Sequence, residues 1–240
     1  YDQYMAVVKL DSKGKRSQFC ANSAVFAAGE MVKAEAKAGK IEKASKANKT
    51  EAVPLSDWEN KKLAALDQYA QLFPADKDTK GMIYEAGYLY YNKNQFKEAS
   101  DRFRVVIGMD PQSKQAMLAA NLILDSFNLV EDWKNLKDVS KAFYDQESLG
   151  NKKFKGETYT IYQNASLKLI EVTLEQDSKK QVAAESLVAW YEEFPKASNA
   201  DLALNNASAY FYSEGSRKQA METRLLLLEN FPKSKFYNGQ

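Results

Sequence analysis

Three tyrosines stand at a spacing that suits binding. Tyr84, Tyr88 and Tyr91 are related as i, i+4 and i+7, so a helix over this stretch carries them on one face. A tyrosine combines a large apolar area with a polar hydroxyl and loses little conformational entropy when it is held in a complex. The chemistry that we expect from them is contact with a peptide, a protein surface or a sugar ring.

The residues that most often carry catalysis are missing. The 240 residues include no histidine and one cysteine, which removes the usual general base near neutral pH, the commonest metal ligand and any internal disulfide. No G-x-x-x-x-G-K-[ST], G-x-G-x-x-G or G-x-S-x-G motif occurs. A glycan-cleaving enzyme would need only carboxylates, but pairs such as Glu192 and Glu193 fit a solvated helix end. We predict no enzyme activity, no metal and no cofactor, and a partly buried helical position for Cys20.

Positive charge gathers at the N-terminal end. The net charge is +2, yet residues 1–50 hold ten Lys or Arg against five Asp or Glu. A lysine series runs through Lys33, Lys37, Lys40, Lys43, Lys46 and Lys49. Because Glu35 and Glu42 interrupt the series, a solvated helix or loop is favoured over a site for an anionic surface. Only five of the 34 basic residues are Arg, so we predict no nucleic-acid binding.

The tyrosines belong to a repeated unit. Pro74 and Pro111 are 37 residues apart, and so are Pro195 and Pro232. The distance from Pro111 to Pro195 is 84 residues, which is two periods and ten further residues. We assign those ten residues to an insertion loop at 147–156, ESLGNKKFKG, whose glycines and asparagine interrupt the helical pattern.

Each period is predicted to be a pair of helices. A first helix over 82–92 has an apolar stripe of Ile83, Ala86, Gly87 and Tyr90. After a turn at 92–94, a second helix places Phe96, Ala99, Phe103, Val106 and Ile107 on one face. It stops before Pro111, because the residue preceding a proline is driven out of helical geometry.

This unit resembles the tetratricopeptide repeat (TPR). That family has a small residue and an aromatic in the first helix, an Ala and an aromatic in the second, and a closing Pro. The matching residues are Gly87, Tyr90, Ala99, Phe103 and Pro111, and in a later copy Ser208, Phe211, Ala220, Leu227 and Pro232. Arg224 stands where the later copy should have an aromatic. Close approach of the two helices predicts small residues facing each other, Gly87 against Ala99 and Ser208 against Ala220.

The resemblance implies an all-α protein, an α-solenoid of about five antiparallel helix pairs in a TPR-like right-handed superhelix. We expect a basic, partly helical N-terminal cap at 1–50 and TPR-like helix pairs at 51–146. After the insertion loop at 147–156, further pairs and a C-terminal cap follow at 157–240. The first pair combines residues 22–37 with 55–73, and the pair at 113–146 is degenerate.

In the TPR family, the first helix of each pair lines a concave groove. The resemblance places these residues there: Tyr84, Tyr88, Tyr91, Leu118, Leu122, Asp125, Asn205 and Tyr212. Some cochaperones of the family hold a carboxylate with Lys, Asn and Arg at positions that here are Tyr84, Tyr88, Leu118 and Leu122, so no carboxylate clamp is expected. The opposing interpretation is that the tyrosines only pack against the neighbouring repeat.

We therefore predict a protein-protein interaction scaffold or adaptor that binds a peptide or partner protein in this groove. The endings FPADK, FPKAS and FPKSK resemble repeats of Gram-negative envelope proteins, which implies a periplasmic or cell-envelope assembly, with the cytoplasm as the alternative. The alternative function is a carbohydrate- or anionic-surface-binding module for peptidoglycan or polysaccharide. No apolar run reaches the length of a transmembrane segment. The start at Tyr1 suggests a processed or excised chain, and the oligomeric state stays open.

Overall fold

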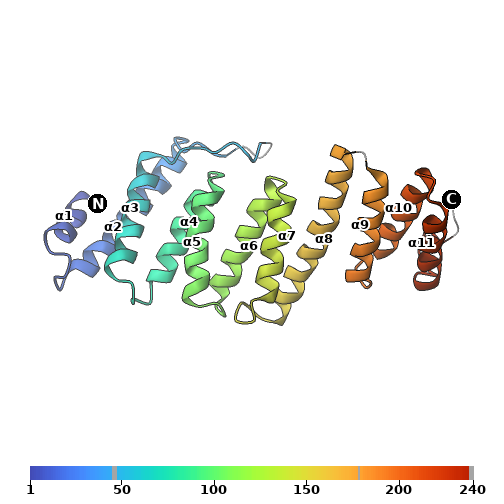
Figure 1. Cartoon of the computed structure of the whole chain (residues 1–240). Coiled ribbons are helices and arrows are strands. Elements are labelled where there is room, and N and C mark those ends of the chain that lie inside the picture. The colour runs from blue at the N-terminus through green and yellow to red at the C-terminus, as the bar shows by residue number, and fades with distance from the viewer. Residues whose placement is uncertain (45–47, 178, 238–240) are drawn as a thin grey trace. The chain divides into compact units, whose positions relative to one another are not determined.

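The computed structural model describes residues 1–44, 48–177 and 179–237 (Figure 1). Within these ranges the protein consists of eleven helices and no strand. The predicted all-α, TPR-like helical-repeat fold is confirmed, whereas the handedness of a superhelix stays a prediction. None of the described helices is both long and apolar enough to span a membrane. Lys46 lies outside the described residues.

The chain forms two compact units. Unit 1 comprises Tyr1–Glu131 and Gln146–Phe154, and unit 2 comprises Asp132–Asp145 and Lys155–Gln240. The chain thus enters unit 2 after Glu131, returns to unit 1 for nine residues and leaves it again after Phe154. The two helices expected to pair within 113–146 therefore belong to different units.

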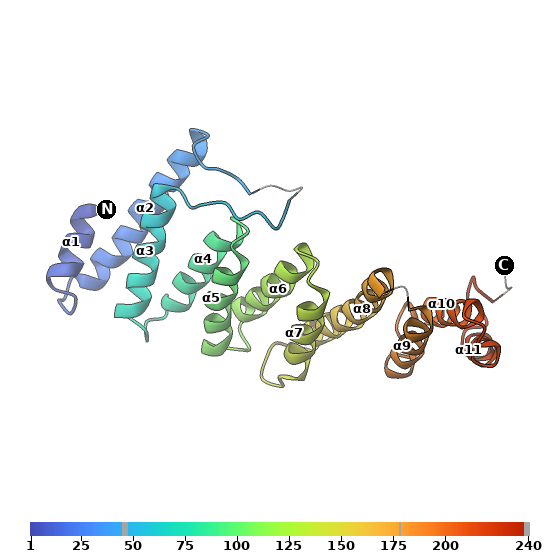
Figure 2. The ribbon, with the colours of Figure 1, turned by 45° about the horizontal axis from the view of Figure 1, so that its top comes forward.

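Unit 1 is a series of helices in which each packs on the next along the chain. The helices are α1 (Asp2–Leu10), α2 (Ser17–Lys37), α3 (Asp57–Leu72), α4 (Thr79–Tyr91), α5 (Phe96–Met109) and α6 (Lys114–Leu129). Consecutive helices run in opposite directions (Figures 1 and 2). Helix α4 also contacts α6, so the first helices of neighbouring pairs lie side by side.

Unit 2 continues the same architecture. Its helices are α7 (Trp133–Asp145), α8 (Lys152–Asp177, of which the first three residues belong to unit 1), α9 (Lys180–Glu193), α10 (Ala200–Ser213) and α11 (Arg217–Asn230). Helix α10 packs on both α9 and α11, and the buried core between them includes Trp190, Phe194, Leu204 and Phe211. Lys155 joins α8 to α7, because its ammonium group donates to the carbonyls of Phe143 and Tyr144, each at 2.7 Å.

Gly87 allows α4 and α5 to pack closely against each other. A Cβ atom added there would stand 2.8 Å from Cε1 of Phe103 and 3.3 Å from Cβ of Arg102, closer than side chains normally approach. The expected partner was Ala99, which is buried one turn earlier. The requirement for a small residue thus comes from the Phe103 ring, which fills the space that a larger residue 87 would take.

The predicted loop at 147–156 is wrong beyond Asn151. Gly150 makes the turn with a φ of +73°, and the Asn151 side-chain oxygen then accepts from the Phe154 backbone N–H at 3.0 Å. This is an N-cap, so α8 begins at Lys152. Gly156 lies inside the helix, where an added Cβ would meet nothing within 4 Å. The additional residues therefore lengthen α8 to 26 residues, against 14 in α10.

The N-terminal helix α1 was not predicted as a separate element. It places Val8, which is fully buried, in a cluster with Cys20, Ala21 and Tyr69. Cys20 is accordingly a buried residue of α2 and a free thiol. Its surroundings are apolar, as expected for a small hydrophobic residue.

The long connection between α2 and α3 is held by the turn between α4 and α5. Lys93 is 2% exposed, forms an ion pair with Glu59 at 2.9 Å and donates to the Glu42 carbonyl at 2.6 Å. Asn94, in a left-handed conformation with a φ of 56°, donates to the Glu51 carbonyl at 3.1 Å. These bonds give the buried side chains of Lys93 and Asn94 their partners and fasten the connection to the turn.

Candidate functional site

The three tyrosines of α4 form a stack along the helix, which we call the tyrosine ladder. The rings of Tyr84 and Tyr88 are 6.4 Å apart with 9° between their planes. Those of Tyr88 and Tyr91 are 6.1 Å apart with 12° between their planes. Tyr88 is 44% exposed, whereas Tyr84 and Tyr91 are half-buried. The middle ring is therefore the one offered to solvent.

The outer rings of the ladder pack against phenylalanines of α5. Tyr84 packs on Phe103 with ring centroids 5.6 Å apart, and Tyr91 packs on Phe96 at the same separation. The Tyr91 hydroxyl donates to the Asp125 carboxylate. Burial and then this carboxylate raise the pKa of Tyr91 above its usual range, and burial raises the pKa of Tyr84. The contacts with Phe103 and Phe96 and the Tyr91–Asp125 hydrogen bond thus hold the two outer rings in place.

Helix α6 extends this surface. Leu118 is 42% exposed, and Leu122 and Asp125 are half-buried. Since α4 contacts α6 and the Tyr91–Asp125 hydrogen bond joins them, the two helices present one surface, which we call the α4–α6 face. It combines the tyrosine ladder with Leu118, Leu122 and Asp125.

The remaining two predicted residues lie in unit 2. The side-chain oxygen of Asn205 accepts from Arg224 at 3.1 Å, and the same guanidinium donates to the Phe236 carbonyl at 2.5 Å. Arg224, which stands where an aromatic residue was expected, thus donates hydrogen bonds to Asn205 and to the segment after α11. Tyr212 is 63% exposed, and the Arg217 guanidinium lies 5.4 Å from the centre of its ring.

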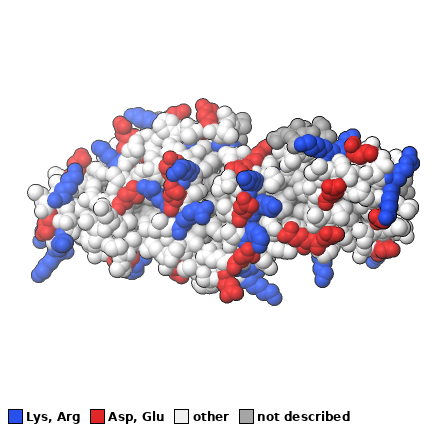
Figure 3. Space-filling view, viewed as in Figure 1, with Lys and Arg blue, Asp and Glu red and all other residues white. Residues whose placement is uncertain are grey.

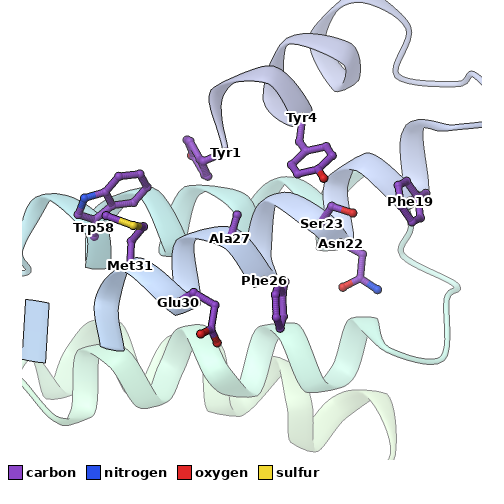
Figure 4. A pocket seen from close by; sticks show the side chains of 10 residues that line it. All are labelled: Tyr1, Tyr4, Phe19, Asn22, Ser23, Phe26, Ala27, Glu30, Met31 and Trp58. Carbon is purple, nitrogen blue, oxygen red and sulfur yellow. The ribbon is translucent and has the colours of Figure 1, made fainter. Parts of the chain in front are cut away.

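A second surface was missed by the sequence analysis. A cleft of about 760 Å³ lies between α1 and α2 in unit 1 (Figure 4). Its apolar lining consists of Tyr1, Tyr4, Phe19, Phe26, Met31 and Trp58. Asn22, Ser23, Ala27 and Glu30 complete it. We call it the aromatic cleft.

One signal for the aromatic cleft was present in the sequence. Phe19, Ser23, Phe26 and Glu30 are spaced i, i+4, i+7 and i+11, a stripe on the side of α2 away from its buried alanines. Tyr1, Tyr4 and Trp58 come from other elements, so no pattern local to α2 could have placed them. Their positions depend on the docking of α1 and α3 against α2.

The described part of the chain offers no group of three or more His, Cys, Asp or Glu side chains that could hold a metal ion. The two surfaces instead display aromatic rings, aliphatic side chains and single polar groups. Such arrangements bind by contact area and by hydrogen bonding.

Comparison with known proteins identifies little. No family model and no curated protein matches the chain. Among solved structures, the chain is similar to one described as "Crystal structure of YrrB: a TPR protein with an unusual peptide-binding site". The similarity covers 96% of this chain and 93% of that one, with 14% sequence identity and a TM-score of 0.34. At this level the likeness carries no argument about the site, and the fold rests on the helices themselves.

Proposed function

We propose that this chain is a protein-interaction module that binds a peptide or partner protein on the α4–α6 face. The observation that carries the proposal is the exposure of Tyr88 between two rings that are themselves fixed. A ring held in one position before binding loses little freedom on binding, so more of its contact energy becomes affinity. Leu118, exposed on the adjacent helix, adds apolar area beside it.

The ladder geometry favours a peptide over a sugar. A sugar ring stacks on the open face of an aromatic ring, whereas the three tyrosines stack on one another. A peptide side chain can instead pack against the edges of the rings and hydrogen-bond to the exposed hydroxyl of Tyr88. We therefore retain protein binding as the single proposed function, with no catalytic step.

We place this function in a bacterial cell-envelope assembly, on the resemblance of the FP-containing helix endings to those of Gram-negative envelope TPR proteins. Fractionation of the source bacterium followed by immunoblotting tests this placement. We expect the protein in the periplasmic or membrane-associated fraction. Recovery with the cytoplasmic proteins would contradict the envelope assignment while leaving the binding function intact.

The binding function is tested by replacing Tyr88. We expect Tyr88→Ala to weaken the affinity for the native partner at least tenfold, equivalent to about 1.4 kcal/mol, because it removes the central exposed anchor. The measurement is a pull-down from the native organism, followed by titration of the recovered partner against wild type and variant.

Tyr237→Ala is the matched control, because Tyr237 is 43% exposed and lies far along the chain, after α11. Circular dichroism should show both variants folded. Equal partner affinity for wild type and Tyr88→Ala would remove the α4–α6 face from the proposal.

A further inference from the structure

The aromatic cleft exposes large apolar side chains that do not contribute to the core of unit 1. Phe19 and Phe26 are each 69% exposed, and they lie on a helix whose buried side is built from small residues such as Ala21, Ala24 and Ala28. Removing either ring would therefore open no cavity in the core. Clustered aromatic side chains that are exposed and contribute little to the core mark a surface on which something else packs.

The walls of the cleft are held in place. The Tyr1 hydroxyl donates to the Lys61 carbonyl at 3.0 Å, and the Tyr1 ring meets the Trp58 ring edge-on at a centroid distance of 5.9 Å. The row of residues from Phe19 to Met31 follows α2 (Figure 4), so at 1.5 Å per residue the cleft is about 18 Å long. That length matches a helical segment of about 12 residues or an extended one of about five.

Positive charge gathers at one end of the cleft, the Phe19 end. At the Trp58 end, the Lys61 ammonium lies 4.2 Å from the centre of the Trp58 ring, but the exposed Asp57 precedes Trp58, so this end carries both signs. At the Phe19 end, the connection from α1 to α2 carries Lys13, Lys15 and Arg16 against a single acid. No ion pair is recorded for these four cations among the described residues. Figure 3 shows both Lys or Arg and Asp or Glu side chains at the outer edge of the N-terminal end.

Inside the cleft, charge is already neutralised. Its one acid, Glu30, forms an ion pair with Lys33 at 2.7 Å. Asn22 and Ser23 are left without a recorded hydrogen-bond partner for their side chains in the part of the chain that the structure describes, and an amide both donates and accepts. A complementary occupant is therefore apolar along its centre, carries acidic groups at the end that meets Lys13, Lys15 and Arg16, and offers polar backbone between them.

We propose that the aromatic cleft binds a segment of a partner protein that has large apolar side chains at its centre and Asp or Glu on one flank, at the Phe19 end of the cleft. This inference goes beyond the proposed function, since it adds a second binding surface and a partner chemistry. The cleft holds the apolar side chains against Phe19, Phe26 and Trp58. Lys13, Lys15 and Arg16 attract the acidic flank, so binding weakens as salt rises.

The test is selection of peptides from a displayed random 12-residue library on the immobilised chain. Enriched peptides are then titrated against wild type, Phe26→Ser and Tyr88→Ala at low and high salt. We expect enriched peptides to carry Phe, Leu, Trp or Tyr flanked on one side by Asp or Glu. Phe26→Ser should weaken them at least tenfold and Tyr88→Ala less than twofold. Because Phe26 is mostly exposed, Phe26→Ser should fold like wild type by circular dichroism.

Three results would overturn the inference. Peptides that depend on Tyr88 and ignore Phe26→Ser would remove the cleft and leave the proposed function standing. Peptides that depend on Phe26 but lack an acidic flank and salt dependence would remove the acidic partner. If no peptide is enriched above a blank support, the cleft fails as a peptide site, and the Tyr88 pull-down alone decides the proposed function.

Discussion

Lys93 is 2% exposed, and its ammonium group is paired with Glu59, itself a buried carboxylate, at 2.9 Å. Glu59 also belongs to a capping box with Ser56, whose backbone N–H donates to the same carboxylate at 2.8 Å. The Lys93 ammonium group thus links three segments: α3, the connection from α2 to α3, and the turn after α4 in which Lys93 itself lies. A buried pair of this kind contributes little net stability but is costly to break from one side only.

Replacing Lys93 with Met should lower the free energy of unfolding by about 3 kcal/mol or more, because it leaves the Glu59 charge buried and unpaired. Urea unfolding measures the change. Lys97→Met is the control, since Lys97 and Asp101 form an exposed pair, with side chains 83% and 62% accessible, and should change stability by less than about 0.5 kcal/mol. Adding Glu59→Gln to Lys93→Met should restore part of the loss, and no recovery would contradict the charge argument.

Tyr91 predicts a pH dependence. Burial and the Asp125 carboxylate raise its pKa in the folded chain above the ordinary value of 10.0. Above pH 10 the unfolded chain releases this proton while the folded chain retains it, so the contribution to stability is complete below pH 10 and declines as pH rises. The difference in unfolding free energy between wild type and Tyr91→Phe should therefore shrink from pH 8 to pH 11. A constant difference would contradict the buried hydrogen bond.

Two glycines inside helices differ in the space around them. Gly87 of α4 stands where Phe103 of α5 leaves no room for a Cβ atom, and Gly156 of α8 faces open space. In both places the glycine lies inside a helix. The neighbouring helix therefore decides what each position tolerates.

Gly87→Ala should lower the free energy of unfolding by about 1 kcal/mol or more, since overpacking outweighs the gain in helix propensity. Gly156→Ala should raise it by about 0.5 to 1 kcal/mol. Thermal unfolding followed by circular dichroism should show melting temperatures that move in opposite directions, by roughly 2 to 4 °C per kcal/mol at this size. A neutral Gly156→Ala would instead favour the loop that the sequence suggested at 147–156.

The whole molecule divides at an unexpected place, because α7 belongs to unit 2 although it follows α6 after a short turn. Within unit 2 the contacts of α7 include Tyr144 against Tyr159 at a centroid distance of 4.7 Å and the Lys141 ammonium 5.8 Å from the Tyr162 ring centre. These contacts connect α7 to α8. We expect α7 to lose structure together with α8–α11.

Hydrogen exchange tests this division. Trp190→Ala removes a core side chain of unit 2 that is 3% exposed, at a cost of about 3 to 5 kcal/mol, and should reduce amide protection in α7 along with α8–α11. Leu66→Ala, at a fully buried position of unit 1, should reduce protection in α2–α5 and leave α7 unchanged. The reverse assignment of α7 would contradict the boundary after Glu131.

The sequence by itself determined the α4–α5 and α10–α11 helix pairs, because their signals are local. Apolar spacing on one helix face and proline at the helix ends act within a few residues. The tyrosine ladder was predictable for the same reason, since its three members share α4. The start of α8 was not, because Gly150 and Asn151 interrupt the helical pattern but also supply the turn and the cap from which a helix begins.

Only the tertiary structure decided which of these faces stays exposed. Tyr91 is half-buried because it packs on Phe96 beside α6, where Asp125, 34 residues away, accepts its hydrogen bond. Lys93 is buried because the α2–α3 connection, with the Glu42 carbonyl, lies over it. The aromatic cleft exists because α1 and Trp58 lie against one face of α2. Contacts between distant segments leave no periodic trace in the sequence, so packing alone determines them.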